Sequence, residues 1–335
     1  MRPQTADGRL QTRVVLALSL VSSLWSAVYL SGCGPKYTYP ADKVAESVES
    51  LCKNDYGLEV RARVVGKTLG ALYYVDDILD ESGQIPRKIH EEMGKIMQDV
   101  TRVALSTDRP LDFSVVVIRD RAHLNELVIT RSVDDTKRAN SDALGVEESI
   151  NRTLFGQGKY QPGEQGESAF VMKEVKLEDF LAEQIAQRIR LGFSKDIKEE
   201  AAALQPFVLV DGLFNRGDGP DDERKFRFSV LSLKAEDPRE TIIAVLKTVA
   251  DVLGGYQYTH YTGIEVLDYL NRRKLEIPRQ VLEDYQAKKI SEQAILDKYL
   301  TESQTIQEAF KLFGFNLSDN AADTEAAAPV NAATP

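Results

Sequence analysis

The sequence predicts an α+β protein with two small sheets, each flanked by helices, followed by a helical C-terminal segment and a disordered tail. Three observations predict this class. Residues 58–64 alternate strictly between apolar and charged side chains, which is typical of a half-buried strand. Residues 86–104 instead repeat apolar side chains at the 3.6-residue period of a helix. The order helix, strand, strand, helix, strand then occurs on both sides of a glycine-rich junction, through either duplication of one unit or chance recurrence.

The first half of the chain carries clear helix and strand signals. The expected elements are a helix over 41–52, strands over 58–64 and 69–75, a helix over 86–104, strands over 111–118 and 124–130, and a helix over 137–150. Gly66 and Lys67 can form the turn of a hairpin between the first two strands. Ser132, with Asp135 three residues later, resembles a capping box and predicts a helix start. Residues 41–155 should therefore form one α+β domain.

The second half follows a linker at 156–166, where glycine is frequent and no periodicity is visible. The expected elements are a strand over 167–175, a helix over 177–189, strands over 206–214 and 226–230, a helix over 242–253, a strand over 256–261, and helices over 264–315. Residues 167–317 are thus a second α+β domain with C-terminal helices. Residues 318–335 hold few large apolar side chains to bury and are expected to be disordered.

The N-terminus has the order of an export signal. Arg2, Arg9 and Arg13 precede residues 14–30, which contain no charged side chain. This stretch ends in Leu30-Ser31-Gly32-Cys33, which resembles the lipobox of bacterial lipoproteins. The resemblance implies that a signal peptide of residues 1–32 is removed and that Cys33 receives a diacylglycerol thioether and an acylated, for example palmitoylated, amino group. A retained membrane helix and an ordinary cleaved signal are the alternatives.

Acyl chains on Cys33 would hold the protein at a lipid bilayer, because each buried methylene contributes about 0.8 kcal/mol. Residues 33–40 would form a short lipidated spacer. In the lipoprotein family, an Asp after the lipidated cysteine retains the protein at the inner membrane, and this chain has Gly34. The resemblance therefore implies the cell envelope, and the outer membrane facing the periplasm if the organism has two membranes.

Composition limits the partners. The formal net charge of −10 argues against nucleic acid as a partner. Once Cys33 is lipidated, Cys52 is the only remaining thiol, so no intramolecular disulfide can form. Cys52 lies on the apolar face of a predicted helix, where we expect it to be buried and inert.

Few residues invite a ligand. On a strand, Tyr256, Tyr258 and His260 would share a face that could stack on a sugar or peptide, and cross-strand packing is the alternative. The three histidines are too scattered in the sequence to predict a metal site, so no metal is expected. No cofactor is expected either, because the Gly66-Lys67-Thr68 fragment lacks the first glycine of a phosphate-binding loop.

No catalytic residue is assigned, and we expect a protein that is not an enzyme. The leading hypothesis is a membrane-anchored envelope lipoprotein that binds another envelope protein in an accessory or assembly role. One alternative is a lipoprotein that binds a small molecule or glycan through Tyr256, Tyr258 and His260. The other is a carboxylate-dependent cell-wall hydrolase that uses Asp76 and Asp77.

Overall fold

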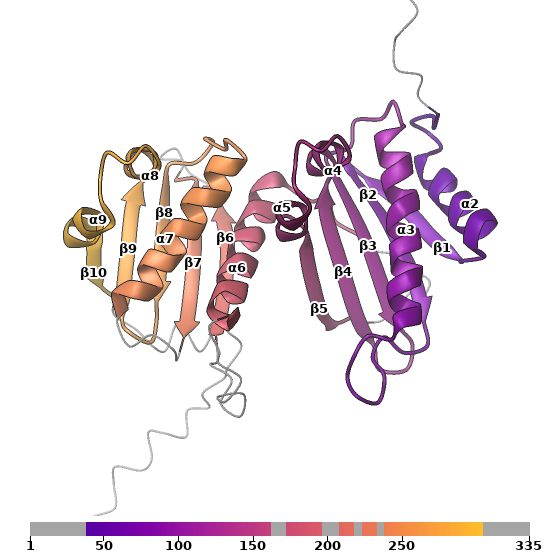
Figure 1. Ribbon diagram of the computed structural model, residues 1–335, viewed down its shortest axis with the longest axis horizontal. Coiled ribbons are helices and arrows are strands. Elements are labelled where there is room, and N and C mark those ends of the chain that lie inside the picture. The colour runs from indigo at the N-terminus through magenta and orange to yellow at the C-terminus, as the bar shows by residue number, and fades with distance from the viewer. Residues whose placement is uncertain (1–37, 162–171, 196–207, 218–222, 233–237, 304–335) are drawn as a thin grey trace, which may run out of the picture. The chain divides into compact units, whose positions relative to one another are not determined.

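The structure is a computed structural model that describes residues 38–161, 172–195, 208–217, 223–232 and 238–303 (Figure 1). The predicted signal peptide, Cys33 and the tail from residue 318 lie outside these residues. The described elements form two five-stranded sheets with helices, which confirms the predicted α+β class. Within the described ranges, no helix is both long enough and apolar enough to cross a membrane.

The first sheet has the strand order β1-β2-β3-β4-β5. Its elements are α2 (Val44–Tyr56), β1 (Val60–Val65), β2 (Thr68–Val75), α3 (Arg87–Leu105), β3 (Phe113–Asp120), β4 (Asn125–Ser132), α4 (Val133–Asn140), α5 (Val146–Asn151) and β5 (Leu154–Lys159). β1 pairs antiparallel with β2, which pairs parallel with β3. The Ser132 hydroxyl caps α4 by accepting the Asp135 amide at 3.4 Å, as the capping-box pattern predicted.

The second sheet has the order β6-β7-β8-β9-β10. Its elements are α6 (Leu177–Lys195), β6 (Val208–Asn215), β7 (Lys225–Ser232), α7 (Pro238–Gly255), β8 (Gly263–Asp268), β9 (Arg273–Pro278), α8 (Arg279–Gln286), α9 (Glu292–Tyr299) and β10 (Leu300–Glu302). Here too the first pair, β6 and β7, is antiparallel and the second pair, β7 and β8, is parallel. The recurrence expected over five elements thus extends over nine elements in the same order, so the fold is a structural repeat.

The chain divides into two compact units. The first comprises the described residues up to Glu126 with 159–161 and Met172, and the second comprises 127–158 with the described residues from Lys173 onward. Of the predicted linker 156–166, residues 156–159 belong to β5, and 162–166 lie outside the described part of the chain.

In the first unit, α2 and α3 cover one face of the strands (Figure 1). Val48 and Cys52 of α2 are fully buried, as are Ile96 and Val103 of α3, so the helical periodicity of the sequence marks the core. α2 ends at Gly57, whose φ of 69° is left-handed and accessible to glycine without strain. This turn brings the chain directly into β1.

In the second unit, α6 and α7 pack on β6, β7 and β8 (Figure 1). Phe180 and Ile185 of α6 and Phe226 and Phe228 of β7 lie in the core, each less than 2% exposed. α6 approaches β6 so closely that a Cβ atom at Gly212 would lie 2.5 Å from the Ala182 carbonyl oxygen. Only glycine fits at this contact.

Two sequence predictions were wrong in detail. Residues 172–175 are not in a strand, and residues 263–278 form β8 and β9 instead of the predicted helix. Ile264 and Val266 are buried at alternate positions beside β7, a pattern too short for the sequence to separate from a helix. The short strands β5 and β10 were not predicted.

The strand predicted over 256–261 was also wrong. The Tyr256 and Tyr258 amides donate to the Val252 and Leu253 carbonyls at 3.1 and 3.0 Å, so this segment terminates α7. Gln257 between them has a left-handed φ of 51°. These amides close the helix and therefore cannot join a strand ladder.

Candidate functional site

The predicted stacking face of Tyr256, Tyr258 and His260 does not form, because it depended on strand alternation. The Tyr256 hydroxyl donates to the Asp135 carboxylate and accepts the Gln184 amide at 3.2 Å. The guanidinium of Arg152 stacks on the Tyr256 ring, 4.5 Å from its centroid. Burial raises the pKa of Tyr256 and so keeps this hydroxyl a donor. Tyr256 is therefore part of the internal packing. A ligand role for it stays a prediction, and the shared strand face on which that prediction depended is absent from this described segment.

Tyr256 belongs to a buried ionic network in the second unit. The side chains of Arg152 and Asp135 are 7% and 8% exposed, and their atoms Nη1 and Oδ1 lie 2.8 Å apart. Arg152 Nε also donates to Glu148 Oε1 at 2.7 Å, and Glu148 accepts Arg188 Nη2 at 2.9 Å. Paired charges that are also hydrogen-bonded, as here, specify a unique packing. This network holds the segment between β4 and β5 against α6.

Tyr258 and His260 lie in different environments. Tyr258 is buried, and its hydroxyl donates to Glu178 Oε1 at 3.1 Å. His260 is exposed and borders a pocket of about 440 Å³ with Arg224 and Arg279. The two rings contact edge to face at 5.9 Å, so they offer no common flat surface.

Three other chemistry-bearing residues converge in the first unit, and the sequence analysis did not predict this cluster. Asp77 follows β2, Asp120 ends β3 and His123 follows β3, and their ligand atoms all lie within 4.8 Å of one another. His123 Nδ1 lies 2.8 Å from Asp77 Oδ1. The sequence did not reveal this cluster, because it depends on β2 and β3 being adjacent and parallel, so that their carboxyl ends meet at one edge of the sheet.

The donor set fits a loop anchor better than a metal site. Asp120 is fully buried and accepts the His123 amide at 2.8 Å and both the amide and the side-chain nitrogen of Asn125, at 3.1 and 2.6 Å. The Ile78 amide also bonds to it. Burial would raise the pKa of Asp120, but these hydrogen bonds outweigh it and hold the pKa below its usual value. About four lone pairs are available on a carboxylate, and the four donors occupy them.

The structural repeat gives an independent reason for this interpretation. Asp268 ends β8, the counterpart of β3, and is also fully buried. It accepts the Asn271 amide at 3.1 Å and the Asn271 side chain at 2.7 Å. Asp268 therefore organises the turn after β8 as Asp120 organises the turn after β3, and among the described residues no carboxylate and histidine cluster forms around Asp268. A shared structural role explains both aspartates.

The hydrolase hypothesis assigned Asp76 and Asp77, and the structure places both at the surface. The Asp76 side chain is fully exposed and lies 3.9 Å from Arg121, and the Asp77 side chain is 50% exposed. Paired catalytic acids need one carboxyl group in a buried position, and neither residue has one. The catalytic assignment stays a prediction.

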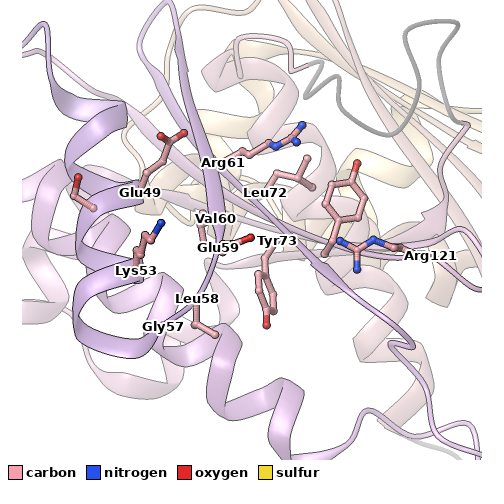
Figure 2. Close-up of a pocket in the computed structure, with 12 residues that line it drawn as sticks. Glu49, Lys53, Gly57, Leu58, Glu59, Val60, Arg61, Leu72, Tyr73 and Arg121 are labelled. Carbon is pink, nitrogen blue, oxygen red and sulfur yellow. The ribbon is translucent and has the colours of Figure 1, made fainter.

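The first unit carries a groove along the edge of its sheet, with a volume of about 670 Å³. Glu49 and Lys53 of α2 lie beside β1, and Arg61 and Arg121 lie across the strand from them (Figure 2). The remaining lining residues are Ser50, Gly57, Leu58, Glu59, Val60, Leu72, Tyr73 and Tyr74. The exposed lining of the groove is mainly polar, with the largely buried Leu58, Val60 and Leu72 between the charged side chains, which suits a polypeptide segment better than a small apolar ligand.

The groove also lies beside a strand edge. β1 is the first strand of the sheet, so β2 pairs with one of its sides. On the other side the Ala62 amide donates to Glu49 Oε1 at 2.7 Å. The sequence could not reveal this groove, because it depends on where α2 settles relative to β1.

Comparison with protein-family models, with curated proteins and with solved structures finds no match to this chain. Its function must therefore be inferred from these sites.

Proposed function

We propose that this protein is a lipid-anchored protein of the bacterial cell envelope that binds another envelope protein. The observation that carries the binding role is the groove of about 670 Å³ along β1, where charged and tyrosine side chains surround the apolar Leu58, Val60 and Leu72. Such a composition is typical of protein interfaces that form and separate, where a polar rim surrounds apolar contacts. The proposed anchor rests on the lipobox residues Leu30 to Cys33 and on the uncharged stretch before them.

The anchor and the groove are compatible with each other in sequence distance. The groove begins on α2, which starts at Val44, a few residues after the spacer that follows Cys33. A partner bound there would lie within a short chain length of the bilayer. Residue Gly34 supports the outer membrane as the site of attachment in a two-membrane organism.

Site-directed photo-cross-linking in the membrane-bound full-length protein tests the binding role. A photoreactive residue at Arg61 in the groove should cross-link reproducibly to one envelope protein. The same residue at Lys88, which is 82% exposed on α3, serves as the control. The binding role fails if Arg61 gives no adduct, or if Lys88 gives the same adducts with equal yield.

Fractionation tests the anchor separately. The wild-type protein should remain in the membrane fraction after an alkaline wash, and a Cys33→Ser variant should be released. Mass spectrometry of the N-terminal peptide should find a triacylated Cys33. A Cys33→Ser variant that still sediments with membranes would exclude lipid as the anchor.

A further inference from the structure

The free edge of β1 has a defined hydrogen-bonding pattern. In an antiparallel pair, residues alternate between those bonded to the partner strand and those pointing away from it. The Ala62 amide donates to Glu49 and so points away from β2, and the same parity directs the amides of Val60 and Val64 outward. Val65 and Thr68 pair across the two-residue turn, which agrees with this parity. β1 therefore presents a row of outward amides and carbonyls.

Glu49 protects this edge. Its carboxylate accepts the central outward amide, and it is the only side chain in the described ranges with a recorded bond to an outward amide of β1. Exposed strand edges template further pairing, and proteins commonly guard them with charged side chains. A carboxylate on a side chain can rotate away, so this guard is reversible.

The groove provides room beside the edge. Its lining runs from Glu49 and Lys53 of α2 to Gly57–Arg61 at the start of β1, so the cavity lies against the strand itself. An added strand needs a spacing of about 4.8 Å from its neighbour and places alternate side chains on opposite faces of the sheet. Its backbone would replace the Glu49 carboxylate as the partner of Ala62.

The charges around the groove select the added strand, because the basic Lys53, Arg61 and Arg121 outnumber the acidic Glu49 and Glu59. Arg61 and Leu72 are register partners, so their side chains lie on the same face, opposite Val60 and Tyr73. Tyr73 bonds to Glu92 of α3 at 3.2 Å, which identifies its face as the helix-covered one. Arg61 and Arg121 thus border the opposite face. In the added strand, acidic side chains at every second position would face these arginines. The apolar side chains between them would lie on the other face, beside Val60.

We propose that the groove binds an extended, acidic segment of a partner protein, which adds to β1 as a further strand and displaces Glu49. This inference rests on the proposed binding function and specifies its mode. Main-chain bonds to the edge supply affinity in this mode, and alternate side chains supply specificity.

Fluorescence anisotropy with the full-length protein in detergent tests this proposal. The probe is a short labelled peptide of alternating valine and glutamate, and the control probe carries lysine in place of glutamate. Only the acidic probe should bind, and hydrogen exchange at the Val60 and Val64 amides should slow in its presence. Arg61→Glu should weaken the acidic probe and improve the lysine probe.

A matched pair of variants isolates the edge amide. Val60→Pro removes the outward donor without disturbing the bonds to β2, because proline is tolerated where an edge amide faces outward. Val60→Ala shortens the same side chain and keeps the amide. Loss of one hydrogen bond should weaken the probe about three- to tenfold in Val60→Pro relative to Val60→Ala. Glu49→Ala should bind the probe more tightly than the wild type.

Several results would overturn the proposal. Equal affinity of Val60→Pro and Val60→Ala, or equal binding of both probes, would exclude strand addition. Sedimentation that finds dimers joined through β1 without peptide would make a second copy the occupant. If Arg61 cross-links a partner while the acidic probe leaves the β1 amides unprotected, this inference fails and the binding function stands. Protection by the probe without any cross-linked partner would remove the binding function and with it the partner protein, and would leave only an edge that accepts an acidic strand.

Discussion

Replacing Arg152 by methionine should destabilise the second unit strongly. Arg152 is 7% exposed and donates to Asp135 at 2.8 Å and to Glu148 at 2.7 Å. Methionine retains much of the volume but removes the nearest and most buried cationic partner of the Asp135 carboxylate, which then keeps only the half-exposed Arg138 at 3.7 Å. Breaking a buried pair from one side costs about 3–5 kcal/mol. Glu148 is less affected, because it is 38% exposed and keeps Arg188.

Urea unfolding followed by far-ultraviolet circular dichroism measures this change in the free energy of unfolding. The double variant Arg152→Met with Asp135→Asn provides the control, because asparagine removes the stranded charge and still accepts the Tyr256 hydroxyl. The double variant should be more stable than Arg152→Met alone, with a coupling of about 1.5 kcal/mol or more. The network contributes little if the double variant loses as much free energy of unfolding as the two single changes together, or if Arg152→Met alone costs less than about 1 kcal/mol.

Three further predictions concern the first unit and the repeated turn. Burial raises the pKa of Asp99, whose Oδ2 has no hydrogen-bond partner, above its unfolded value of about 3.9. Its stabilising contribution is thus fully present below that value and is lost as pH rises through the folded pKa. Urea unfolding across pH should reveal this decline in the wild type and its absence in Asp99→Asn. Asp120→Ala and Asp268→Ala should each lower the free energy of unfolding by about 1–3 kcal/mol. Zinc should leave the melting temperature of the wild type unchanged. If zinc instead raises that temperature, and the rise is lost in Asp120→Ala, the cluster is a metal site. Burial, reinforced by the charge of Asp99, raises the pKa of Cys52 to about 12. In a Cys33→Ser background a thiol reagent should therefore label Cys52 at pH 8 only after denaturant is added, and rapid labelling of the native protein would contradict its burial.

The two matched aspartates also explain why similar motifs can titrate in opposite directions. Burial raises the pKa of Asp268, and the hydrogen bonds from Asn271 and from the Leu270 amide do not outweigh it. Asp120 accepts bonds from Asn125 and from the His123 and Ile78 amides, and these lower its pKa in spite of burial. Stability from Asp120 is therefore present above its unfolded pKa and lost as pH falls, whereas stability from Asp268 is lost as pH rises.

By itself, the sequence determined the α+β class, the α2-β1-β2-α3-β3 series and the burial of Cys52. These features depend on short-range periodicity, which records the side of a helix or strand that meets the core. The capping-box pattern of Ser132 and Asp135 also predicted the α4 cap, because capping acts within a single turn. Sequence further suggested a lipobox at Cys33, a prediction that concerns residues outside the described structure.

Only the tertiary structure decided the rest, because it depends on contacts between distant segments. Tyr256 bonds to Asp135, which lies 121 residues earlier, and no local pattern links the two. Asp77 meets Asp120 and His123 because β2 and β3 are adjacent and parallel. The groove exists because α2 leaves space beside the outer edge of β1 while Glu49 reaches Ala62. Register and helix placement fix such sites, and both follow from the packing of the whole unit.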